Sequence, residues 1–323
     1  MIEVKNLVKK YGDHMAIDHL NFTIEKGRVY GFLGPNGAGK STTMNIMTGY
    51  LGATEGEVLI DGHDILKEPE EAKKHIGYLP EIPPLYLEMR VEEYLTFAAE
   101  LKGIAKKQRK QVVREAMQMA KLEEVSGRLI RNLSKGYRQR VGLAQAILGF
   151  PEIIILDEPT VGLDPKQIIE IRELIRDLAK KHTVILSSHI LAEVREVCDY
   201  ILIISKGKLV ASDTPDRLEA QMSGAETVEI LARADADLVR EILREIVQIR
   251  KAEIQERADG TCLAKITAEE GADIRETVFF AFANRQCPLL SLHTSKISLE
   301  DVFLELTQND AVGKEEEAHA GNL

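Results

Sequence analysis

A glycine-rich loop at residues 34–41 carries the clearest chemical signal in the sequence. It matches the pattern G-x-x-x-x-G-K-[ST] and reads Gly34, Pro35, Asn36, Gly37, Ala38, Gly39, Lys40 and Ser41. An apolar run, 29–33, precedes the loop, and a run of helical character that begins at Thr42 follows it. Glycines let successive backbone N–H groups point at one anion, and a helix N-terminus adds partial positive charge. The loop and Thr42 are therefore predicted to bind the phosphates of a nucleotide.

Side chains of the loop and two later acids complete the predicted chemistry. Lys40 is expected to reach the β- and γ-phosphates of ATP, and Ser41 to place its hydroxyl on Mg²⁺. Asp157 follows the apolar run 153–156, and open α/β sheets bind ligands at the carboxyl ends of strands, so Asp157 is predicted to hold the same ion. Glu158 comes next, where a carboxylate can activate water for attack on the γ-phosphate. A helix cap remains an alternative for Asp157 alone.

The elements that position these residues alternate in type along the first two thirds of the chain. Short apolar strands alternate with helical stretches up to about residue 211, which indicates α/β layering. The runs 29–33, 153–156 and 184–186 are continuously apolar, as expected of parallel strands covered by helices on both faces. Residues from about 88 to 130 instead show helical periodicity and are predicted to form a helical insertion between two strands.

The pattern changes after Pro215 and predicts a second domain. A strand at 226–231, a helix at 236–246 and a hairpin turned at 259–260 are followed by another helix and strand. The order β-α-β-β-α-β is that of a small ferredoxin-like α+β unit, closed by a helix at 299–307. The predicted domains are therefore 1–215 and 222–307. The acidic tail 308–323 is expected to be disordered.

Composition restricts the classes of partner. The net charge of −10 gives no overall attraction for nucleic acid, which is not an expected partner. Cys198, Cys262 and Cys287 lie far apart, so neither a zinc site nor a disulfide framework is predicted, and a reducing compartment fits. The longest apolar runs end well before the ~18 residues of a membrane span, and no secretory segment begins the chain.

The segment 133–140 links these motifs to a known family. It reads Leu-Ser-Lys-Gly-Tyr-Arg-Gln-Arg and resembles the Leu-Ser-Gly-Gly-Gln signature of ATP-binding cassette (ABC) ATPases. Further similarities follow the family's order, at Tyr11, at 77–81, at 161–164 and at His189. The resemblance covers about residues 1–215. It implies a P-loop NTPase fold of the ABC type and a Mg²⁺-dependent ATPase that works as a dimer, either of identical chains or of two paired ABC subunits.

The resemblance also implies roles for residues outside the phosphate loop. Tyr11 would stack on adenine, although a half-buried turn tyrosine is the alternative. Ser134 and the backbone N–H of Gly136 would contact the γ-phosphate held by the opposite protomer. Asp164 would lie at the junction between the protomers. His189 would act with Glu158 in catalysis by contacting the γ-phosphate and positioning the carboxylate and water.

Two positions depart from the family pattern. Glu81 stands where the family usually has Gln, and it is expected to bind Mg²⁺ and nucleotide through a carboxylate that adds negative charge near the phosphates. Lys135 and Tyr137 replace Gly and Gln within the signature. Because Ser134 and Gly136 remain, the phosphate contact is expected to survive.

The segments 77–95 and 298–303 resemble the ABC-2 group of bacterial exporters. That resemblance implies a motor subunit at the cytoplasmic face of the cell membrane, docked through residues 81–130 on a permease encoded by a separate chain. Tyr86 and Tyr94 are candidates for that contact or for the core. A soluble ABC ATPase acting on ribosomes or DNA is the alternative function. The C-terminal domain could bind a regulatory ligand or extend the dimer interface.

Overall fold

The computed structural model describes residues 1–222, 227–269, 272–295, 299–304, 306 and 307. Their contacts form two compact units, Met1–Pro215 with the chain from Leu306 onward, and Asp216–Glu305. Each unit is described by itself. The predicted tail at 308–323 and the first residue of the strand predicted at 226–231 lie outside the described residues.

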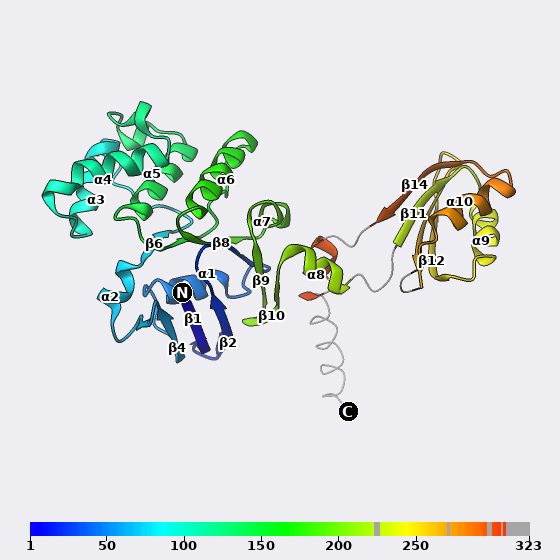
Figure 1. The fold of residues 1–323 in the computed structure, drawn as a ribbon, viewed down its shortest axis with the longest axis horizontal. Coiled ribbons are helices and arrows are strands. Elements are labelled where there is room, and N and C mark those ends of the chain that lie inside the picture. Colours follow the sequence, from blue (N-terminus) through cyan, green and yellow to red (C-terminus); the bar gives the residue numbers. More distant parts are fainter. Residues whose placement is uncertain (223–226, 270–271, 296–298, 305, 308–323) are drawn as a thin grey trace. The chain divides into compact units, whose positions relative to one another are not determined.

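A six-stranded sheet forms the centre of the first unit (Figure 1). In spatial order its strands are β10 (Lys208–Asp213), β9 (Tyr200–Ser205), β3 (Val29–Leu33), β8 (Thr183–Ser188), β7 (Ile153–Leu156) and β6 (Ile76–Leu79). All neighbours pair in parallel except β10, which is antiparallel to β9. Every residue of β3, β7 and β8 is buried, so the three apolar runs are confirmed as parallel strands covered on both faces.

A second, antiparallel sheet in the same unit was not predicted. Its strands, in spatial order, are β2 (His14–Ile24), β1 (Ile2–Tyr11), β4 (Glu55–Ile60) and β5 (His63–Asp64). Helix α1 (Lys40–Met47) contributes Met44, Ile46 and Met47 to one hydrophobic core shared with both sheets. This packing holds the N-terminus of α1, and with it the glycine-rich loop, in a fixed place.

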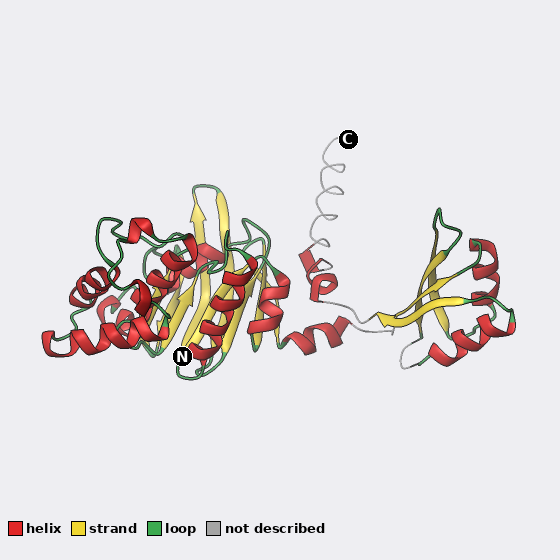
Figure 2. Ribbon diagram, turned by 90° about the horizontal axis from the view of Figure 1, so that it is seen from above, coloured by secondary structure: helices red, strands yellow, loops and turns green. Residues whose placement is uncertain are grey.

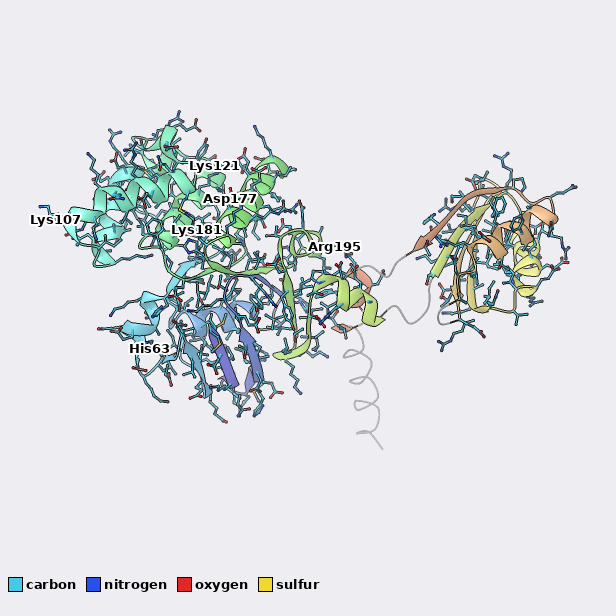
Figure 3. The ribbon with its side chains drawn as sticks, in the orientation of Figure 1. His63, Lys107, Lys121, Asp177, Lys181 and Arg195 are labelled. Atoms are coloured by element: carbon cyan, nitrogen blue, oxygen red, sulfur yellow. The ribbon has the colours of Figure 1, made fainter. Side chains whose placement is uncertain are left out.

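Helices cover the β6 side of the sheet (Figure 1). They are α2 (Pro69–Lys74), α3 (Val91–Leu101), α4 (Lys106–Met119) and α5 (Lys135–Ile147), with short 3₁₀ turns at Glu123–Val125 and Ile130–Asn132. The predicted helical insertion therefore lies between β6 and β7, which pair directly. In Figure 3 the labelled Lys107 marks this helical layer, and His63 marks the antiparallel sheet.

Three further helices follow β7, namely α6 (Pro165–Ala179), α7 (Leu191–Val197) and α8 (Pro215–Met222). None of the helices in the described ranges is long and apolar enough to cross a membrane.

The second unit has the predicted ferredoxin-like order. Its elements are β11 (Thr227–Ala232), α9 (Ala236–Arg244), β12 (Ile249–Glu256), β13 (Cys262–Ala268), α10 (Arg275–Asn284) and β14 (Leu289–Ser295). The sheet order is β12-β13-β11-β14, with every pair antiparallel. Figure 2 shows both helices on one side of the strands, where the buried core lies.

A close contact between α5 and β6 generates a stability prediction. A Cβ added at Gly77 would lie 2.2 Å from the carbonyl oxygen of Ala146, so the helix and the strand must separate if the residue becomes alanine. Gly77→Ala is expected to lower the free energy of unfolding by roughly 1–3 kcal/mol, measured by denaturant unfolding. Gly127→Ala is the matched control, because a Cβ there meets nothing within 4 Å. Equal stability of the two variants would contradict the packing described here.

Candidate active site

A cavity of about 500 Å³ lies where β3, β7 and β8 end. Its lining contains residues of the predicted site and Val161 of the segment 161–164, together with His14 and Ala16, which the sequence did not single out. The predicted residues that line it are Tyr11, Asn36, Gly37, Ala38, Gly39, Lys40, Ser41, Thr42, Glu81, Glu158 and His189. The structure thus brings together segments that are more than a hundred residues apart in sequence.

The loop between β3 and α1 has the backbone that an anion site needs. Gly37 and Gly39 have φ angles of 79° and 104°, in the left-handed region that favours glycine. A Cβ at Gly39 would lie 2.7 Å from the carbonyl oxygen of Ala16, and one at Gly34 only 2.3 Å from that of Ile204. Gly39 is therefore required both by its conformation and by close backbone packing, whereas Gly37 is required by its conformation and Gly34 by close packing. The loop ends at the N-terminus of α1, so its geometry fits a phosphate group.

Lys40 places a cation at the floor of the cavity. The residue is 6% exposed, and its Nζ donates to the carbonyl oxygens of Gly34 and Pro35 at 2.6 and 3.2 Å. Burial lowers the pKa of Lys40, while the nearby charges of Glu158 and Asp157 act in the opposite direction. A buried ammonium beside an N–H-rich loop is suited to a polyanion.

Two oxygens of the predicted metal set lie together. The Ser41 hydroxyl donates to Asp157 Oδ1 across 3.4 Å, and the same carboxylate oxygen accepts from the Ser187 hydroxyl at 2.6 Å. Asp157 is 5% exposed, and Glu81 lines the cavity with an exposed side chain. Hydroxyl and carboxylate oxygens are the donors that Mg²⁺ prefers, so this set fits the ion.

Glu158 is held in an unusual conformation beside the phosphate loop. Its φ of 47° is left-handed, which costs energy in a residue other than glycine and is characteristic of functional sites. Its N–H donates to the Ser187 hydroxyl at 2.8 Å, and its Oε2 lies 2.9 Å from His189 Nδ1. The backbone and the carboxylate of Glu158 are therefore each fixed by a side chain near the end of β8.

Ser187 is a site residue that sequence reasoning missed. It is fully buried, and its single hydroxyl joins the Asp157 carboxylate to the Glu158 backbone. A serine directly after the apolar run 184–186 was the available signal, because a hydroxyl buried at the end of a strand needs partners.

A buried carboxylate on α7 was missed as well. Glu193 accepts from the hydroxyls of Thr160 and Ser188 at 2.6 and 3.2 Å, and its other oxygen lies 3.8 Å from Arg172 Nη2. Thr160 lies two residues after Glu158, and Ser188 directly precedes His189. The hydrogen bonds to Glu193 therefore link the segment that contains Glu158 to the segment that contains His189.

Six predicted residues are not among those that line this cavity: Gly34 and Pro35 at the start of the loop, the buried Asp157, and Ser134, Gly136 and Asp164. Ser134 caps α5 by accepting from the N–H of Tyr137 at 3.4 Å, and Asp164 caps α6 by accepting from that of Gln167 at 2.9 Å. A Cβ at Gly136 would lie 2.7 Å from the Gln167 side chain, so the two helix N-termini lie side by side. They form a separate surface that contains Ser134, Gly136 and Asp164, which we call the helix-tip surface.

Tyr11 is the last residue of β1 and is 49% exposed at the cavity. Lys9 Nζ lies 5.2 Å from the centre of its ring. The ring is therefore accessible for stacking on a planar group.

Known proteins are similar to this chain in sequence and in fold. Residues 17–161 match the family described as ABC transporter. The chain is 33% identical to the bacitracin transport ATP-binding protein BcrA of Bacillus licheniformis, across 97% of this chain and 99% of that relative. It is 30% identical to Nod factor export ATP-binding protein I of Cupriavidus metallidurans, across 95% of this chain and 97% of that protein.

Solved structures agree with the sequence matches. An ATP binding subunit of an ABC transporter superimposes with a TM-score of 0.63 at 31% identity, covering 69% of this chain and 93% of that chain. A dimeric post-hydrolysis state of the ATP-binding cassette MJ0796, bound to ADP and Pi, gives a TM-score of 0.60 at 28% identity, covering 66% of this chain and 98% of that chain.

Removing the Ser187 hydroxyl tests its predicted importance. Ser187→Ala leaves the buried Glu158 N–H without its acceptor and removes the hydrogen bond that Ser187 donates to the Asp157 carboxylate. The loss of these two hydrogen bonds is expected to raise the free energy of the transition state by about 1–3 kcal/mol, which lowers kcat for ATP hydrolysis roughly 10- to 100-fold. Steady-state kinetics, with Ser212→Ala on the edge strand β10 as the control, measure this. A wild-type kcat for Ser187→Ala would show that the hydroxyl has no part in catalysis.

Proposed function

The chain belongs to the family of ABC transporter ATP-binding proteins, and from this premise we propose that two cassettes dimerise around ATP and drive a separate membrane permease in export. The observation that carries the proposal is the separation of the site into two surfaces. The cavity presents the phosphate loop, Glu158 and His189, whereas Ser134, Gly136 and Asp164 lie on the helix-tip surface. A second cassette can bring its helix-tip surface to the cavity of the first.

Within one chain, the cavity residues divide the work of hydrolysis. The loop N–H groups and Lys40 hold the phosphates of ATP, and Tyr11 stacks on the base. Ser41, Asp157 and Glu81 would hold Mg²⁺, which would offset the phosphate charge. Glu158 accepts the proton of the attacking water, and His189, 2.9 Å from its carboxylate, keeps that carboxylate aimed and contacts the γ-phosphate.

The helix-tip surface supplies the remaining contacts from the partner cassette. Ser134 stands at the N-cap of α5 with an exposed side chain, and Gly136 lies in the first turn. Helix N-termini carry partial positive charge and favour anions, so this surface suits a γ-phosphate. ATP then joins the two cassettes, and hydrolysis releases them because the bridging phosphate is lost. The dimeric form of the cassette MJ0796 supports this arrangement.

Exposed apolar residues at the edge of the helical layer support docking on a permease. Ile82 and Tyr86 are 82% and 58% exposed, and Ile82 follows Glu81 directly in the chain. Tyr94, the other candidate for this contact, is 2% exposed and donates to Gln145 Oε1 at 2.6 Å, so it belongs to the core. Relatives named for bacitracin transport and Nod factor export support an export role at the cytoplasmic face of the membrane.

Replacing the proposed base separates binding from hydrolysis. Glu158→Gln keeps the shape of the side chain and the capacity of the protein to bind ATP. The amide cannot accept the proton of the attacking water, so turnover is expected to fall by at least ~100-fold. ATP should then convert the purified variant into a stable dimer, detected by size-exclusion chromatography with light scattering.

Lys40→Ala is the matched control, since it removes the cation that holds the phosphates. It is expected to bind ATP more weakly and to remain monomeric at ATP concentrations that dimerise Glu158→Gln. Hydrolysis at the wild-type rate by Glu158→Gln would refute the assignment of the base.

Recovery of the chain from its native membranes tests the permease. The tagged protein, purified after gentle solubilisation, is expected to bring with it a chain with several membrane spans, and the complex should hydrolyse ATP only with Mg²⁺. A double substitution of exposed residues, Ile82→Ser with Tyr86→Ser, should reduce that recovery without changing the ATPase activity of the isolated chain. Recovery of ribosomes or DNA would instead favour a soluble function.

A further inference from the structure

The second unit contains a cavity of its own, far in sequence from the nucleotide-binding residues. It measures about 460 Å³ and lies between α9 and the edge strand β12. That volume is within the range of small-molecule sites, roughly 300–1,000 Å³. Its position follows from the topology, because β12 pairs on one side only and α9 ends at Arg244, leaving part of this strand uncovered.

The floor of this cavity is apolar. Leu243 and Ile246 are buried, and Ile249 and Ile254 are half-buried where the helix ends and the strand begins. Val247, in the turn between α9 and β12, is 89% exposed. A ligand that covers the half-buried Ile249 and Ile254 with an apolar group removes their exposed surface from water, which is favourable.

The rim of the cavity carries charge of one sign. Four cationic side chains line it, namely Arg240, Arg244, Arg250 and Lys251, and no acidic residue does. This local excess of positive charge contrasts with the net charge of −10 for the whole chain. Like charges that converge on one small space repel each other, so the arrangement favours a bound anion.

Two of the four cations lack a counter-charge. Arg240 pairs with Asp237 at 2.6 Å, and Lys251 with Glu253 at 2.7 Å. Within the described part of the chain, the side chains of Arg244 and Arg250 form no hydrogen bond or ion pair with another residue. Guanidinium groups bind carboxylate and phosphate through paired hydrogen bonds, and both groups are therefore available for such a ligand.

We propose that this cavity binds an amphiphilic organic anion, with its phosphate or carboxylate head between Arg244 and Arg250 and its apolar part on the half-buried Ile249 and Ile254. Both the cationic rim and the apolar floor are needed to define the class of ligand. An inorganic anion would leave the apolar floor in water, and an uncharged apolar molecule would leave the guanidinium pair without a partner. On this proposal the C-terminal unit binds a ligand and is not only a structural extension.

Calorimetric titration of the full-length chain with three matched probes tests the proposal. Monododecyl phosphate, below its micelle concentration, carries both features; inorganic phosphate lacks the tail, and dodecyltrimethylammonium carries the same tail with the opposite charge. Monododecyl phosphate is expected to bind at least ~10-fold more tightly than either of the others, and its affinity should fall as salt is added.

Charge-reversed variants locate the binding. Arg244→Glu with Arg250→Glu is expected to weaken monododecyl phosphate binding by at least ~10-fold, because two charge-assisted contacts become repulsive. Arg233→Glu with Arg257→Glu makes the same change in net charge at exposed positions of the same unit outside the cavity, and should bind like the wild type. Circular dichroism checks that both double variants keep the wild-type melting behaviour.

Vesicle sedimentation identifies the source of the anion. Vesicles of phosphatidylcholine with and without phosphatidylglycerol are mixed with the wild type and the cavity variant. Cavity-dependent binding only to the anionic vesicles indicates a lipid headgroup, while binding of monododecyl phosphate without vesicle binding indicates a free amphiphile. Equal binding of all three probes, or equal binding by the cavity variant and the wild type, overturns the proposal.

Discussion

Close backbone packing around the glycine-rich loop is the constraint on which the rest of the active site depends. Gly39 and Gly207 approach the same carbonyl group, that of Ala16 on β2, so closely that a Cβ on either would lie less than 3 Å from its oxygen. The N–H of Gly207 also donates to the carbonyl oxygen of Ala38 at 2.9 Å. The antiparallel sheet and the turn between β9 and β10 thus hold the loop from two sides. A rigid loop can present its N–H groups to a phosphate without further ordering, which reduces the entropic cost of binding.

The side chains proposed for catalysis depend on a second constraint, the register of β7 and β8. Parallel pairing of Leu156 with Leu186 places Ser187 beside the acidic pair, so that one hydroxyl orders both Asp157 and Glu158. Glu193 couples the segments just beyond these strand ends, through Thr160 and Ser188. A displacement of either segment therefore changes the distance between Glu158 and His189.

The sequence predicted the parts of the fold and site that depend on local pattern. The sequence was sufficient to predict the phosphate loop, the strand before Asp157 and the β-α-β-β-α-β order. Each of these depends on a pattern of consecutive residues. Ser187 and Glu193 were not predicted, since they meet their partners from about 30 residues away, through strand register that a single sequence does not reveal. The antiparallel sheet was missed for the same reason, because β1 and β4 pair across some 50 residues. Tyr86 and Tyr94 were equal candidates for the permease contact in the sequence, and only the packing shows that the ring of Tyr86 is exposed and that of Tyr94 buried.

ATP-dependent cross-linking between two copies tests the central claim, that one chain's cavity is completed by another chain's helix-tip surface. Asn36→Cys and Ser134→Cys are introduced together into the Glu158→Gln chain, at exposed positions of the two surfaces. The natural cysteines Cys198, Cys262 and Cys287 are buried, which limits their reaction. A covalent dimer that forms with a short bismaleimide only when ATP is present is the predicted result. No covalent dimer with ATP, although ATP binds, would contradict the account.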